Sequence, residues 1–128
     1  MSVLYTAATI EQDETIDTLR GEGYDISERT LRHWRKIRIL PPLDRIGNEW
    51  FYPVTILPEI REICIQRGRF IREVLTVYTI EGVEFHLIKV EVRRVKGRLK
   101  LFLFEEGGGF IVKEIEREQE VLDAFTRN

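Results

Sequence analysis

The strongest chemical signal in the sequence is a run of basic residues between positions 28 and 38. Against one acidic residue, Glu28, this segment carries five cationic side chains: Arg29, Arg32, Arg35, Lys36 and Arg38. At 3.6 residues per turn, Arg29, Arg32 and Lys36 fall along one stripe of a helix, and Leu31, Trp34 and Ile37 form an apolar core stripe. Arginines on a helix can bind phosphates or fork onto guanine in the major groove. The segment predicts a DNA-contacting helix, with a solvated charged face as the alternative.

Residue types that support catalysis or metal binding are few and scattered. The two histidines, His33 and His86, lie in different halves of the chain, and Cys64 is the only cysteine. Catalytic sites need several groups in mutual reach, and thiolate metal sites need several cysteines. The glycines at 107–109 lack the lysine and hydroxyl residue of a P-loop. We therefore expect no enzyme, no metal and no cofactor, and we expect Cys64 to be a core residue.

Length and composition restrict the classes of protein further. The chain has 128 residues, of which 43% are hydrophobic and 33% charged, with a net charge of -2. This is too short for a barrel or doubly wound enzyme and too apolar for a disordered tail. A basic surface can still exist inside a nearly neutral total. With no apolar run of membrane-spanning length and no basic-flanked leader, a cytoplasmic location without membrane contact is predicted.

The basic segment must be positioned by the elements around it, and the spacing of apolar residues that predicts these elements changes near Gly68. In residues 1–68 the apolar residues recur at helical spacings, which predicts helices over 10–20 and 28–38 and a third from Pro58 to Gly68. Ser27 is the expected N-cap of the second helix. A turn and an aromatic strand at 45–52 predict a small β-wing before the third helix.

Residues 69–128 follow a strand pattern instead. Strands are predicted over 83–95, 98–104 and 110–115, followed by an amphipathic C-terminal helix. Residues 70–80 fit a strand or a helix, and the strand is favoured. A change of parity predicts a bulge at Leu87 and Ile88 that would keep both apolar sets inward. The segment 99–104 is apolar on both faces, which indicates a central strand covered on each side, for example by a second subunit.

Several motifs in the first half together resemble the N-terminal domain of the MerR family of transcription regulators. The matching residues are Ser27, the run Arg29-Thr30-Leu31-Arg32, the aromatic pair His33-Trp34, the stop Leu40-Pro41-Pro42, and Arg45, Gly47, Asn48 and Tyr52. The resemblance covers about residues 24–67. It implies a winged helix-turn-helix in which a recognition helix at 27–37 enters the major groove and a wing at 45–52 holds the DNA backbone.

The basic helix and this resemblance together give ten candidate DNA-binding residues. They are Ser27, Arg29, Thr30, Arg32, His33, Arg35, Lys36, Arg45, Asn48 and Tyr52. The chain departs from the family at Glu49-Trp50, where a tyrosine-arginine pair is usual. It also lacks the long dimerisation helix after the winged domain, so no effector mechanism carries over.

The predicted fold class is α+β, with an N-terminal winged helix-turn-helix, a small antiparallel β meander and a C-terminal helix. The preferred function is a sequence-specific double-stranded DNA-binding transcription regulator of a prokaryote or phage. Because one winged helix reads only a short half-site, a homodimer through 69–128 is expected. The alternative is a non-enzymatic adaptor that binds a protein partner through the β-rich part. A third hypothesis is RNA binding, in which the aromatic residues and the basic cluster at 93–100 would contact the RNA.

Overall fold

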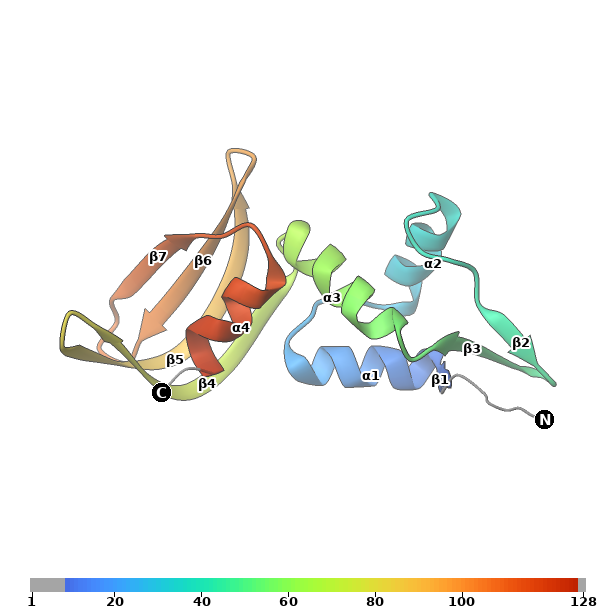
Figure 1. The fold of residues 1–128 in the computed structure, drawn as a ribbon, viewed down its shortest axis with the longest axis horizontal. Helices are drawn as coiled ribbons and strands as arrows, with labels where there is room; N and C mark the ends of the chain where they lie inside the picture. Colours follow the sequence, from blue (N-terminus) through green and yellow to red (C-terminus); the bar gives the residue numbers. More distant parts are fainter. Residues whose placement is uncertain (1–8, 127–128) are drawn as a thin grey trace.

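The computed structural model describes residues 9–126, and this part of the chain is a mixed α+β protein with four helices and two antiparallel sheets (Figure 1). The helices are α1 (Gln12–Glu22), α2 (Glu28–Lys36), α3 (Ile56–Gln66) and α4 (Glu118–Thr126). The small sheet has the order β1-β3-β2, with β1 (Thr9–Glu11), β2 (Asp44–Ile46) and β3 (Glu49–Pro53). The large sheet has the order β4-β5-β6-β7, with β4 (Phe70–Ile80), β5 (Val83–Val95), β6 (Arg98–Glu105) and β7 (Phe110–Glu114).

Helix α2 forms where its cap and apolar spacing predict it. Ser27 is the N-cap, with its side chain accepting from the backbone N–H of Thr30, and Leu31 and Trp34 are buried. The helix ends at Lys36, two residues earlier than predicted. Ile37 is 45% exposed, so the expectation that it lines the core is wrong. Arg38 adopts a positive φ of 66° just after the helix, which turns the chain out of the apolar stripe.

The large sheet confirms the strand over 70–80 and adds it to the meander, which therefore has four strands rather than three. The predicted irregularity at Leu87 and Ile88 is also present, because the pairing of β5 with both neighbours shifts there. Leu87 and Val90 are buried on either side of the shift, but Ile88 itself is 43% exposed. The bulge thus keeps the two apolar sets inward by turning Ile88 outward, which corrects the expectation that Ile88 points inward.

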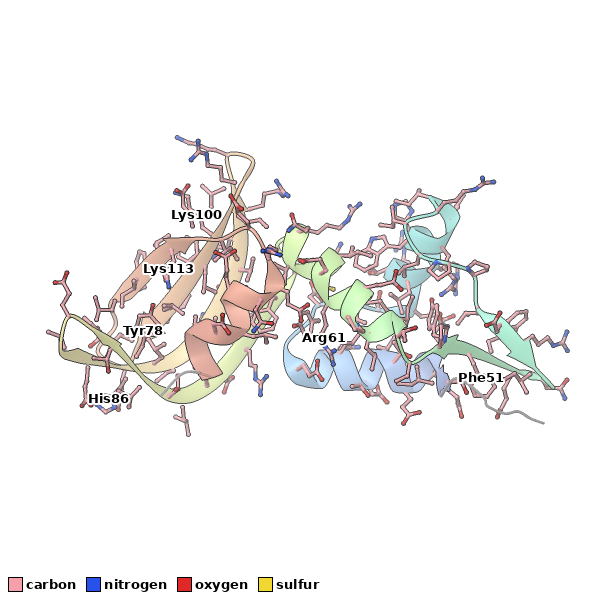
Figure 2. The ribbon with its side chains drawn as sticks, in the orientation of Figure 1. Phe51, Arg61, Tyr78, His86, Lys100 and Lys113 are labelled. Carbon is pink, nitrogen blue, oxygen red and sulfur yellow. The ribbon has the colours of Figure 1, made fainter. Side chains whose placement is uncertain are left out.

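The chain segments around Gly23 and Gly68 join the helical part to the large sheet. Gly23 accepts a hydrogen bond from the Ile71 N–H at 2.9 Å, and Tyr24 pairs with Phe70 in an isolated bridge. Arg61 in α3 forms a two-pronged ion pair with Glu22 in α1, and it lies between the two helices in Figure 2. Apolar side chains from both parts belong to one buried cluster. The boundary predicted near Gly68 is therefore a packed junction.

Helix α4 lies across one face of the large sheet (Figure 1). Its residues Val121 and Ala124 are buried, Ala124 lines a pocket with Tyr78 and Lys113 of the sheet, and Tyr24 donates a hydrogen bond to Glu118 at 2.9 Å. The predicted C-terminal helix is thereby confirmed. Within residues 9–126, no helix has the length and apolar character required to cross a membrane.

Candidate nucleic-acid interface

A basic stripe on α2, defined as Arg29, Arg32 and Lys36, is exposed as its helical spacing predicts. His33 is exposed beside it. The Arg32 guanidinium forms an ion pair of 2.7 Å with Glu28, one turn earlier, and both side chains are more than half exposed. Exposed pairs at this spacing are weak and exchange readily for another anion. Arg32 is therefore available to a phosphate or a base edge.

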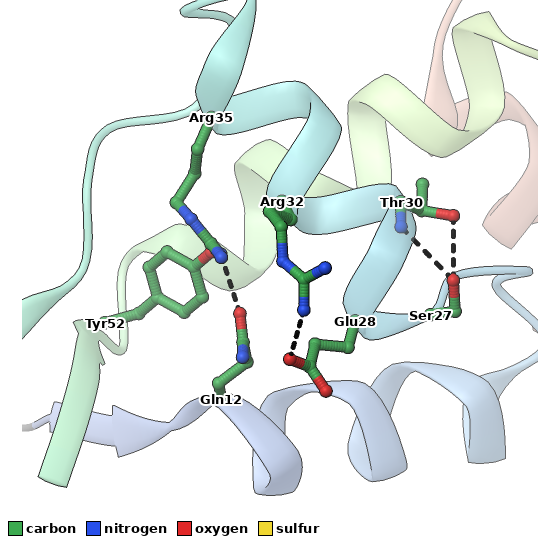
Figure 3. A network of polar contacts seen from close by, with 7 residues as sticks. All are labelled: Gln12, Ser27, Glu28, Thr30, Arg32, Arg35 and Tyr52. Carbon is green, nitrogen blue, oxygen red and sulfur yellow. Dashed lines mark hydrogen bonds and ion pairs between the residues drawn. The ribbon is translucent and has the colours of Figure 1, made fainter.

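Ser27 and Thr30 have a structural task at the start of the same helix. The Thr30 N–H donates to Ser27 Oγ at 3.2 Å, and the two hydroxyl oxygens lie 3.0 Å apart (Figure 3). This cap satisfies an amide that the first turn leaves without a helical partner. Both residues are half-buried. Their hydrogen bonds fix the residue at which α2 begins, and with it the start of the basic stripe.

Arg35 and Tyr52 hold α2 in place. The Arg35 guanidinium donates to Gln12 Oε1 at 2.6 Å and to the Tyr52 hydroxyl, which joins α2 to α1 and β3 (Figure 3). Tyr52 is fully buried and Arg35 half-buried. Burial raises the pKa of Tyr52, and the hydrogen bond from Arg35 opposes part of that rise. We assign these two candidates a positioning role, because Tyr52 has no surface to offer a ligand.

The hairpin of β2 and β3 carries the remaining candidates, Arg45 and Asn48, at its exposed tip. Arg45 donates to the Gly47 carbonyl at 2.9 Å and to Asn48 Oδ1 at 3.4 Å. Gly47 takes a φ of 65°, which a two-residue turn with Asn48 requires and which side chains disfavour. In Figure 1 this hairpin and α2 both lie at the end of the molecule away from the large sheet.

A groove separates α2 from the hairpin, and Trp50 forms part of its wall. It is lined by Arg32, Arg35, Lys36, Pro42, Leu43 and Trp50. Trp50 is 51% exposed, and the Arg45 guanidinium lies 5.8 Å from the centre of its ring. Of the aromatic run at 50–52, Tyr52 is fully buried whereas Trp50 is not. Trp50 shares a face of β3 with Tyr52 but lies closer to the hairpin tip, beyond the core.

Other reactive groups lie away from this interface. Cys64 is buried in α3, and burial raises the pKa of its thiol to about 12. This confirms its predicted place in the core. In the described part of the chain, no three His, Cys, Asp or Glu side chains are grouped so that they could hold a metal ion.

The chain was compared with family models, with curated proteins and with solved structures, and none of the three comparisons found a match.

Proposed function

We propose that the protein is a sequence-specific double-stranded DNA-binding transcription regulator whose residues 1–68 form a winged helix-turn-helix of the MerR kind. The observation that supports this most directly is the exposed basic stripe of α2, which lies next to a hairpin that also presents a cation, Arg45. In the proposal α2 enters the major groove, and the hairpin acts as the wing on the DNA backbone.

The chemistry of the stripe suits this role. Arginines at positions 29 and 32 can donate to guanine O6 and N7 or to phosphates, and Lys36 supplies a point charge to the backbone. Asn48 and Arg45 lie where the wing would meet phosphates. A reading helix must be held rigidly, and the contacts of Arg35 with Gln12 and Tyr52 provide this support.

A single copy of this interface would read a short half-site, so the proposed regulator is a homodimer formed through residues 69–128. The biological setting proposed with it is a prokaryotic or phage promoter. The full chain should therefore have the mass of a dimer in light scattering. A full chain that remained monomeric would contradict this part of the proposal.

The test compares two variants that break the same ion pair. Arg32→Ala removes the guanidinium, and Glu28→Gln removes only the carboxylate that pairs with it at 2.7 Å. We expect Arg32→Ala to weaken binding to a selected duplex by about 1–3 kcal/mol if Arg32 reads a base. We expect Glu28→Gln to bind at least as tightly as the parent, because a carboxylate near DNA is lost. Both variants should melt close to the parent, since exposed pairs contribute little.

Fluorescence anisotropy at several salt concentrations measures the electrostatic part of the duplex-binding free energy. Each phosphate contact contributes a slope of about -0.9 to the logarithmic salt dependence, so loss of a phosphate contact at Arg32 would reduce the slope by about one. Unchanged affinity of Arg32→Ala would remove α2 as the reading element. Absence of salt-sensitive duplex binding by the parent would overturn the proposal and leave a protein-binding adaptor as the remaining class.

A further inference from the structure

The two faces of the large sheet differ in what covers them. Lys113 in β7 pairs with Leu101 in β6, and Lys113 lines a pocket with Ala124 of α4, so α4 covers the face that carries Leu101. Side chains alternate along a strand, and Phe102 therefore points to the opposite face. We call this opposite side the aromatic face. It includes Lys89, Arg93, Lys100, Phe102, Phe104 and Phe110.

The aromatic face is open to solvent along its β7 edge, and the rings of Phe102 and Phe104 further in are half-buried. Phe110 and Val112 in the edge strand β7 are 58% and 41% exposed, so nothing in residues 9–126 covers them. The ring centres of Phe102, Phe104 and Phe110 form a triangle with sides of 5.8, 5.8 and 6.3 Å. Three clustered aromatic rings on an exposed sheet form a platform on which other flat rings can stack.

Cations lie directly on this platform. The Lys89 ammonium is 4.3 Å from the centre of the Phe104 ring, and the Arg93 guanidinium is 4.5 Å from that of Phe102. Lys100 is the partner of Arg93 across the two strands. A guanidinium over a ring adds a second stacking layer, and the N–H groups of Arg93 that do not meet Glu91 can bind phosphate.

The carboxylates on this face leave part of the positive charge uncompensated. Glu91 is paired with Arg93 at 2.9 Å, Glu114 is paired with Arg98 at 3.1 Å, and Glu73 lies opposite Lys89 on the neighbouring strand. Among the described residues, Lys89 and Lys100 form no ion pair. An apolar protein surface placed here would bury charged groups of both signs, and this is costly because Lys89 and Lys100 form no ion pair that would offset their desolvation. A second copy placed face to face would bury the same charged groups twice.

We propose that the aromatic face binds single-stranded nucleic acid. One base stacks on the exposed ring of Phe110 and another on the guanidinium layer that Arg93 forms over Phe102, and the phosphates are neutralised by Lys89, Arg93 and Lys100. Only a single strand can occupy the platform, because a duplex keeps its base faces stacked inside the helix. This surface belongs to the large sheet and is independent of the duplex-binding stripe on α2.

The experiment measures anisotropy of fluorescein-labelled dT16 and U16 with the full chain at several salt concentrations. The parent should bind a strand with a logarithmic salt slope of about -2, the value for three phosphate contacts on a single strand. Phe110→Leu keeps an apolar side chain at an exposed position but removes the ring, and it should weaken binding by about tenfold, as loss of one base stack does.

Charge reversal provides a matched pair of variants. Lys100→Glu changes the aromatic face, whereas Arg117→Glu makes the same change of net charge at an exposed residue on the connection to α4. Only Lys100→Glu should lower the affinity and flatten the salt slope; in Figure 2 Lys100 lies on the large sheet, away from the α2 end. Arg32→Ala should leave single-strand binding unchanged, so a failure of the duplex proposal would not affect this result.

Two outcomes would overturn the proposal. One is the absence of salt-sensitive binding to dT16 and U16, or equal affinities of Phe110→Leu, Lys100→Glu and the parent. The other is self-association in sedimentation experiments that Phe110→Asp abolishes, in a protein that binds no single strand. That second result would identify the aromatic face as a dimer interface.

Discussion

Gly23 is the residue at which a single added methyl group should most disturb the junction between the helical part and the large sheet. It ends α1 with a φ of 109°, and its carbonyl accepts a hydrogen bond from Ile71. A Cβ atom at this position would lie 2.7 Å from the Ile71 carbonyl oxygen and 2.9 Å from Arg72 Cβ. The first of these is a backbone atom of β4, which cannot move without disturbing the pairing of β4 with β5.

Gly23→Ala lowers the free energy of unfolding in two ways. A left-handed conformation costs a residue with a side chain about 1–2 kcal/mol relative to glycine. Relieving the backbone clash requires a shift of packed strand, which costs about 1–3 kcal/mol as overpacking does. The reduced freedom of the unfolded chain returns about 0.4–1 kcal/mol. The free energy of unfolding should therefore fall by about 2–4 kcal/mol, a large share of the stability of a small protein.

Gly21→Ala is the matched control, two residues earlier in the same helix. A Cβ atom there meets nothing within 4 Å, and the residue does not take a positive φ. Alanine in a helix is about 0.5–1 kcal/mol more stable than glycine, so this variant should be slightly stabilised. Urea unfolding, followed by the fluorescence of buried Trp34, should show a midpoint lowered by about 1–2 M for Gly23→Ala and raised for Gly21→Ala.

The directions of the two shifts in urea midpoint show whether the contact of Gly23 with β4 stabilises the junction. If both variants unfold at the same urea concentration as the parent, the close approach of Gly23 to β4 does not exist in solution. If both are destabilised equally, the effect belongs to the end of α1 and says nothing about the junction. Opposite shifts of the stated sizes support a junction built on this contact.

Three further changes test individual groups. Because burial raises the pKa of Cys64 to about 12, we expect its thiol to resist a thiol reagent at pH 8 in the folded protein and to react fully in urea, as measured by absorbance. Burial also raises the pKa of Glu118, which accepts from Tyr24, so its carboxylate lowers stability increasingly as the pH rises through that raised value. Glu118→Gln should therefore gain stability relative to the parent between pH 4 and pH 7, and an equal difference at both pH values would contradict this. Ser27→Ala should cost about 1 kcal/mol in urea unfolding because Thr30 loses its cap; no change would show that water replaces the hydroxyl.

Local signals predicted the parts of the fold that local interactions determine. The cap at Ser27 and the spacing of Leu31 and Trp34 placed α2 correctly, because a cap and a core stripe act within a few turns. The strand over 70–80 could be read with either period. Its pairing with β5 determines that it is a strand, and at the start of β4 this pairing joins Phe70 to Val92, which is 22 positions away. Strand β1 was not predicted, because three residues carry no periodic signal and the strand exists only through its pairing with β3.

The same distinction applies within the candidate site. Charge and helical spacing predicted that Arg29, Arg32 and Lys36 would share an exposed stripe, which the structure confirms. Nothing in the sequence separated Arg35 from them. Its position is determined by Gln12, which lies 23 residues away and comes from another helix. A residue of the same type therefore serves as an anchor, and only the tertiary contact reveals the difference.

The distribution of charge connects the two proposed surfaces with the small net charge of -2. Exposed acids gather on α1, including Asp13, Glu14 and Asp17, and no basic residue of that helix precedes Arg20. Exposed cations form the α2 stripe, and Lys89, Arg93 and Lys100 lie on the aromatic face among three carboxylates. In the two proposals a polyanion would be repelled by the acids of α1 and attracted by these cations, so the field would orient it before contact. Such separation needs no net positive charge, and it favours binding at two defined surfaces over coating of the whole protein by nucleic acid.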